Sequence, residues 1–245
     1  LDEAEQLASL AAASPRGTLK ITCAHAIGVE RLAPAIARFS RRHPDLRFDV
    51  VVSDRVVDLV EEGFDLAIRI GSIGSEQLVA RKLGQMQLVL CASPAYLKRR
   101  GTPRQVADLA RHDLLSYAYA RTPRLWVLTG PDGERVEVKA TGSLHANSGQ
   151  VLVAAAAQGQ GIVLETDFHV AQALASGRLV RVLPQYQGGA GDIWAVYPSR
   201  RHLSAKVRLF VDHLADEFAV TAPTRPARPV TARKRRQGGP GAAPR

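Results

Sequence analysis

The chain has 245 residues and a formal net charge of +10, with 46% hydrophobic and 23% charged residues, proportions that are ordinary for a globular protein. No apolar run reaches the roughly 20 residues that span a bilayer, so the sequence predicts no membrane segment. Seven basic and no acidic residues lie in 221–245, which leaves +3 for residues 1–220. The high charge therefore belongs to the tail, and we expect 220–245 to be disordered.

The first third of the chain alternates between predicted helices and strands. Apolar residues at helical spacing predict a helix over 1–13, which we interpret as the end of a helical connector. Strands are predicted over 18–24, 46–52 and 64–70, with helices over 28–42 and 56–62 between them. Near-continuous apolar strands separated by helices predict a parallel sheet that is covered on both faces.

The rest of the chain continues this alternation after a long extended segment, 78–92. Two strand-like runs flank Pro131-Asp132-Gly133 and predict a hairpin. Further helices are predicted over 102–109, 148–158, 167–175 and 203–218, and short strands over 162–165, 179–183 and 193–197. The fold class is therefore α/β.

No motif in the sequence indicates catalysis. A Walker A loop, HExxH, GxSxG and paired CxxC are all absent, and the seven histidines are scattered. Cys23 and Cys91 each lie in an apolar stretch, which favours two buried thiols over a disulfide or a metal pair. We expect no enzymatic activity, no cofactor and no metal site.

Two strand-to-helix junctions are candidate binding features. Residues 24–28 link a strand to a helix, and Asn147-Ser148 precedes a second helix. The unpaired N–H groups at the start of a helix attract anions. The alternative for Asn147 and Ser148 is helix capping alone. His25, at the first junction, is either a group that titrates near neutral pH beside a ligand or an ordinary surface histidine.

Charged residues at two predicted strand ends complete the candidate set. Arg69 ends one strand, where a guanidinium can pair with a carboxylate through two hydrogen bonds. Its alternative is a salt bridge with Asp65 or Glu76. Glu165 and Asp167 flank another strand end, and the alternative for both is helix capping.

Several segments, taken in order and spacing, resemble LysR-type transcription regulators. They are Leu32-Ala33-Pro34, His43-Pro44, 58–60, 63–71, 78–83, 92–97, 101–103, 131–133, Asn147-Ser148, 159–162, 174–179 and 197–204. Each segment alone is weakly specific, but together they cover about residues 1–219. The resemblance implies the family's effector domain, which is similar to a type 2 periplasmic binding protein: two Rossmann-like subdomains joined by two crossover strands, with a ligand cleft between them.

The resemblance also implies a division of this chain. Residues 17–91 plus 192–219 would form subdomain 1, and 92–191 would form subdomain 2. Residues 1–13 match the end of the family's dimerising linker helix, and the winged helix-turn-helix head that precedes it in the family is missing. By matched position, the effector contacts are expected at His25, Ile27, Ser53, Arg69, Gly71, Asn147, Ser148 and Glu165.

The function implied is that of a ligand sensor in the bacterial cytoplasm. A small anionic effector, a carboxylate or an aromatic acid, would act through a homodimer or homotetramer, and promoter DNA would be bound only by the missing head. Two features depart from the family pattern: Glu165 follows Leu164 where the family often has Leu-Pro, and the basic tail has no counterpart. The tail is either a solvated end or a weak, nonspecific contact to nucleic acid.

Two other functions remain open from the sequence. A stand-alone solute-binding protein for a small organic acid has the same architecture, and an upstream signal peptide would mark it. An enzyme on the same fold is the third reading, against which the absent catalytic cluster argues.

Overall fold

The first half of the structure is built on three parallel strands. Strand β1 (Gly17–Cys23) lies between β2 (Leu46–Val52) and β3 (Leu66–Ile70). The computed structural model describes residues 15–55, 57–71, 78–120, 122–199 and 203–220. The helix predicted over 1–13 and the basic tail beyond residue 220 lie outside this range. The predicted parallel strands are thus confirmed in this half.

One continuous helical segment follows β1. It consists of α2 (His25–Ile27), a π-helical turn η1 (Gly28–Leu32) and α3 (Ala33–Arg42). Pro34 has no N–H group to donate to the preceding turn, and the turn widens there, so that the Ala33 N–H bonds to Gly28 O. The helix predicted over 28–42 is confirmed, and it begins three residues earlier.

The prediction of a helix over 56–62 was wrong. The described residues of this segment, 57–62, form a loop that ends in turns. Asp58 Oδ1 accepts hydrogen bonds from the backbone N–H groups of Val60 and Glu61, at 2.8 and 3.0 Å. Gly63 then reverses the chain with a left-handed φ of 69°. An aspartate that satisfies nearby N–H groups closes such a segment without a helix.

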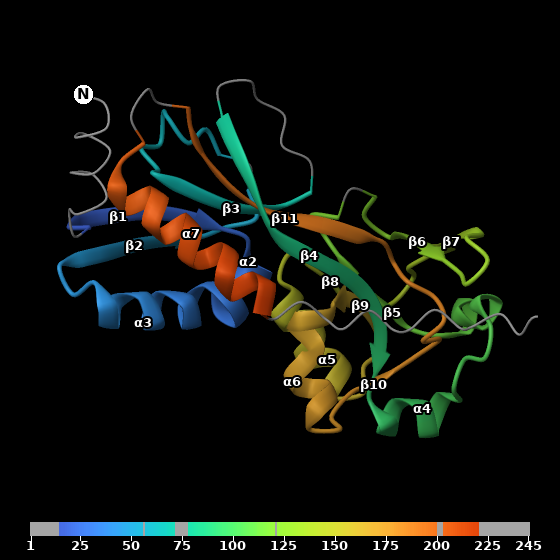
Figure 1. The fold of residues 1–245 in the computed structure, drawn as a ribbon. Coiled ribbons are helices and arrows are strands. Elements are labelled where there is room, and N and C mark those ends of the chain that lie inside the picture. Colours follow the sequence, from blue (N-terminus) through green and yellow to red (C-terminus); the bar gives the residue numbers. More distant parts are fainter. Residues whose placement is uncertain (1–14, 56, 72–77, 121, 200–202, 221–245) are drawn as a thin grey trace, which may run out of the picture.

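Two long strands connect the halves (Figure 1). Strand β4 (Leu78–Ala92) pairs with β11 (Ala190–Pro198) as far as Gln87, and from Leu88 onward it pairs with β9 (Ile162–Thr166). This change of partner lies inside the segment 17–91. The subdomain limits drawn from the resemblance stay a prediction.

The second half adds strands and helices to the same mixed sheet, whose order is β2-β1-β3-β11-β4-β9-β5-β8, with β10 also paired to β4. Its strands are β5 (Leu114–Tyr117), β8 (His145–Ala146) and β10 (Val180–Arg181), and its helices are α4 (Pro94–Arg100), α5 (Gly149–Ala157) and α6 (Asp167–Ala175).

The predicted hairpin is formed by β6 (Leu125–Thr129) and β7 (Arg135–Lys139). The helix predicted over 102–109 is instead a short 3-10 helix, η2 (Val106–Arg111), which starts at a capping box between Gln105 and Asp108. The last helix, α7 (Ala205–Val220), returns to pack on α3 and β4. The first half therefore consists of β1–β3, α2, α3 and α7, the second half consists of β5–β10 and α4–α6, and β4 and β11 connect them.

Both faces of the sheet are covered at the inner strands β3 and β5, as the apolar strands predicted, whereas the edge strand β2 is mostly exposed, including Val50, Val51 and Val52. In β5, Leu114 belongs to one apolar cluster and Leu115 to the cluster on the opposite face. In β3, Leu66 and Ile68 face the main core of the first half, and Ala67 faces a smaller cluster. In the part of the chain that the structure covers, no helix is long and apolar enough to cross a membrane.

The two cysteines are buried and unbridged, as the sequence predicted. Burial raises the pKa of the Cys23 thiol to about 11 and that of Cys91 to about 12. Both thiols are therefore protonated near neutral pH and act as small apolar groups in the core.

Candidate functional site

The two halves touch where α2 contacts α5. We call this region the junction and define it as α2, Asp54, Tyr117 and α5. It contains both strand-to-helix connections that the sequence singled out. The junction is therefore the place where the predicted site residues can be compared with the structure.

Asp54 hydrogen-bonds to both halves at the junction. Its Oδ1 accepts from the backbone N–H of His25 at 2.9 Å, and its Oδ2 accepts from the hydroxyl of Tyr117 at 2.5 Å. Asp54 follows β2 in the first half, whereas Tyr117 ends β5 in the second. Burial, followed by the bond to Asp54, raises the pKa of Tyr117, so the phenol stays protonated and donates.

Arg69 holds the loop that carries Asp54. Its guanidinium donates to Ser53 O at 3.2 Å and to Thr22 Oγ1 at 2.8 Å. Burial lowers the pKa of Arg69, and the negative charge of Asp54 opposes that shift. The group remains a cation, because the ordinary arginine pKa lies far above neutral pH.

The salt-bridge alternative for Arg69 fails for Asp65. The carboxylate of Asp65 lies 2.8 Å from Lys206 Nζ instead, and Glu76 lies outside the described residues. The sequence correctly placed Ser53 and Arg69 at one edge, because the ends of parallel strands meet at the same edge of a sheet.

Glu165 is buried in the second half, against the start of α5. Its Oε2 accepts from the Thr166 N–H at 3.2 Å and lies 3.2 Å from His169 Nδ1. A Cβ atom at Gly149 would lie 2.6 Å from Glu165 Oε1, so the carboxylate packs directly on the first residue of α5. Among the described residues, His169 Nε2 and Thr166 Oγ1 are buried without a hydrogen-bond partner.

The other predicted site residues differ in what they offer a ligand. Ile27 is fully buried in the core of the first half, because this position turns inward from the helix, and its contact with the effector stays a prediction. Ser148 caps α5, because its side chain accepts from the Val151 N–H at 3.5 Å. This is the helix-capping role that the sequence offered as the alternative to ligand binding. His25 and Asn147 are exposed. Gly71 has a φ of 100° and donates to Asp192 O.

Three residues of this region were missed from the sequence. Asp54 stands next to Ser53 at the same strand end and could have been found by the same argument. Tyr117 was hidden because the four-residue strand β5 was not predicted. His169 lies in the first turn of α6, four positions after Glu165 near the end of β9, and the connection between strand and helix brings the two side chains within 3.2 Å.

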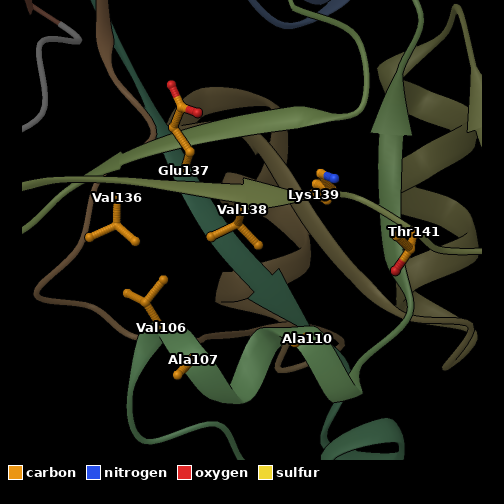
Figure 2. A pocket seen from close by; sticks show the side chains of 8 residues that line it. All are labelled: Val106, Ala107, Ala110, Val136, Glu137, Val138, Lys139 and Thr141. Atoms are coloured by element: carbon orange, nitrogen blue, oxygen red, sulfur yellow. The ribbon is translucent and has the colours of Figure 1, made fainter.

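A pocket of about 310 Å³ lies elsewhere, between η2 and β7 (Figure 2). Val106 faces Val136 and Val138 across it, and Glu137 points away. None of the predicted site residues lines it. In the described part of the chain, no cluster of three or more His, Cys, Asp or Glu side chains could hold a metal ion.

Comparisons with known proteins agree with this architecture. The LysR substrate binding domain family matches residues 12–219. The HTH-type transcriptional regulator DmlR of Escherichia coli K12 is 39% identical over 206 residues, which cover 84% of this chain and 66% of DmlR. The HTH-type transcriptional activator TtdR of E. coli UTI89 is 38% identical over 82% of this chain and 64% of TtdR.

Solved structures give the same result. CrgA, a LysR-type transcriptional regulator from Neisseria meningitidis, has a TM-score of 0.77 at 31% identity, covering 89% of this chain and 73% of CrgA. AphB of Vibrio cholerae has a TM-score of 0.76 at 28% identity, covering 88% of this chain and 75% of AphB. The chain spans just under two thirds of the length of DmlR and TtdR. It belongs to the LysR substrate-binding domain family and has the fold of the effector-binding domain of LysR-type transcription regulators.

Proposed function

We propose that this chain senses a small organic acid at the junction between its two halves. The observation that carries the proposal is the position of Arg69, a partly buried cation whose guanidinium bonds to the backbone oxygens on either side of Asp54, those of Ser53 and Arg55. A guanidinium in partly dry surroundings attracts a carboxylate more strongly than one in water. Ser53, Ser148 and the backbone around His25 supply further polar groups.

The proposed mechanism is a shift between arrangements of the two halves. A ligand shifts such an equilibrium only by its difference in affinity for the two states. The halves are joined covalently by β4 and by the segment that leads into β11, whereas the contacts at the junction are noncovalent. An acid that changes those contacts would therefore reorient one half against the other.

In the whole protein, we propose that this change reaches promoter DNA through an attached DNA-binding head in a homodimer or homotetramer. The named relatives are described as HTH-type transcriptional regulators or activators, which also supports a regulatory rather than an enzymatic role in the cytoplasm. The stand-alone solute-binding function has no support from these relatives.

The test is calorimetric titration with a panel of acids: succinate, malate, tartrate, benzoate and salicylate. We expect at least one to bind the wild-type chain and to bind at least about tenfold more weakly to the Arg69→Ala, Ser148→Ala double variant, since a lost hydrogen bond to a charged group is worth about 1.5–3 kcal/mol.

The matched control is Arg47→Ala with Ser40→Ala, which makes the same changes on β2 and α3, away from the junction. It should bind like wild type. Equal affinity of the junction variant and the wild type would reject this site.

A further inference from the structure

The carboxylate of Asp54 has the hydrogen-bond pattern expected of a bound acid. One oxygen accepts from the His25 N–H in the first half, and the other accepts from the Tyr117 hydroxyl in the second half. Among the side-chain hydrogen bonds of the described junction residues, the Asp54–Tyr117 bond is the one that joins the two halves. A ligand carboxylate that bridged the halves at this point would find the same two donors.

The surroundings of Asp54 also fit an anion. Arg69 lies close enough for the Asp54 charge to oppose the lowering of its pKa by burial. The salt bridges of the described residues include none to Arg69, whose guanidinium bonds to Thr22 Oγ1 and to backbone oxygens. Asp54 therefore supplies a negative charge near this cation.

We propose that Asp54 is an internal ligand, which occupies the position of the effector's carboxylate in the unliganded chain and is displaced when the effector binds. This inference rests on the proposed function. An acid that entered beside Asp54 without displacing it would bring two carboxylates together, which is unfavourable unless one takes up a proton. Displacement avoids this repulsion and, in the same step, releases Tyr117 from the first half.

Glu165, the other carboxylate near the junction, is not placed to be displaced by an effector. Its carboxylate is 6% exposed and bonds to Thr166 and His169 within the second half. Moving it would leave a buried histidine without its partner and would not free a contact between the halves. Asp54 is therefore the displaceable carboxylate of the pair.

The experiment removes the Asp54 side chain by substitution and then adds acetate to the solution as a replacement carboxylate. Acetate is the aspartate side chain without its bond to the chain. In Asp54→Ala, the His25 amide should exchange with solvent about tenfold faster than in wild type, as expected for the loss of a hydrogen bond to a charged group. Adding 50 mM sodium acetate should reverse most of this increase, whereas sodium chloride at equal ionic strength should not. Exchange is followed residue by residue by NMR.

Control variants separate charge from position. Asp49→Ala removes the same charge from an exposed position on β2 and should show neither the acceleration nor the response to acetate. Asp54→Asn keeps an acceptor for the His25 N–H and should exchange at an intermediate rate. Wild type should not respond to acetate, because its position is filled.

Two results would overturn the inference. Unchanged His25 exchange in Asp54→Ala would show that the bridge does not hold in solution, and acceleration that acetate cannot reverse would show that the position takes no external carboxylate. Neither result depends on knowing the effector. The acid panel with the Arg69→Ala, Ser148→Ala variant judges the proposed function separately, so that either can fail alone.

Discussion

Asp54 at the junction and Glu165 beside the start of α5 are two carboxylates in different surroundings. Asp54 is half-buried and bonded to both halves, whereas Glu165 is buried and bonded within the second half. Glu165 packs against Gly149, where the start of α5 favours negative charge. The helix starts that were expected to attract an anion therefore already face anions of the chain itself. An acid must compete with these groups rather than enter an empty site.

At the same scale, His112 should make stability depend on pH. The ring is buried, with Nδ1 3.1 Å from the Tyr96 hydroxyl. Burial, followed by the charge of Arg100, lowers the pKa of His112 below its ordinary value of 6.5. The unfolded chain therefore binds more protons than the folded chain below about pH 6.5. The stabilising contribution is complete above this pH and is lost as the pH falls.

Urea unfolding between pH 8 and pH 5 measures this effect. We expect the free energy of unfolding to decrease toward pH 5 and to decrease less steeply in His112→Asn, which keeps a polar atom near the Nδ1 position. An equally steep decrease in the variant would assign the pH dependence to other groups, such as His43, whose pKa burial also lowers.

At the scale of elements, local patterns predicted what local forces decide. The helix predicted over 28–42 and helix α6 have apolar periodicity and clear stops, and both formed, the first with three additional residues at its start. The segment 57–63 does not form the predicted helix, because the Asp58 side chain accepts hydrogen bonds from two backbone N–H groups and so stabilises a turn in its place. Strand β5 has four residues, too few for a period to be visible, so Tyr117 and its bond to Asp54 could not be predicted. The contact joins residues 63 positions apart, and no local pattern encodes it.

The docking of α5 on β9 and α6 should depend on the absence of a side chain at Gly149. A Cβ atom there would lie 2.6 Å from Glu165 Oε1 and 2.7 Å from His169 Cε1. Both side chains are buried and hydrogen-bonded to one another, so neither can move aside freely. We expect Gly149→Ala to lower the free energy of unfolding by about 1–3 kcal/mol, the usual cost of overpacking.

Gly84→Ala is the matched control for this substitution. The atoms nearest to its added Cβ belong to Phe218, at 3.8 Å and beyond, which is ordinary van der Waals contact. It should change the urea midpoint little. A Gly149→Ala variant as stable as the Gly84→Ala variant would show that α5 is not seated as tightly as described.

At the scale of the whole molecule, the halves are interlocked as well as connected. Phe168 belongs to α6 in the second half, yet its side chain is buried in the main core of the first half. The guanidinium of Arg31 lies over this ring, 5.3 Å from its centre. Together with the Asp54–Tyr117 bond, this contact holds the halves in one arrangement. A rotation of one half on β4 and β11 would have to break both contacts, which links the state of the junction to the packing of α6.

Phe168→Ala should therefore weaken the coupling between the halves as well as the core. Truncation of a buried phenylalanine costs about 3–5 kcal/mol, whereas Val151→Ala, at a position 50% exposed on the neighbouring helix α5, should cost less than about 0.5 kcal/mol.

The two tryptophans report on each half separately, since Trp194 lies on β11 and Trp126 on β6. In single-tryptophan versions of the chain, obtained by replacing the other with Phe, the wild-type background should give the same urea midpoint for both probes. In Phe168→Ala the two midpoints should separate, because each half then unfolds with less support from the other. Coincident midpoints that both shift downward would show that Phe168 stabilises the molecule without serving as a separable link between its halves.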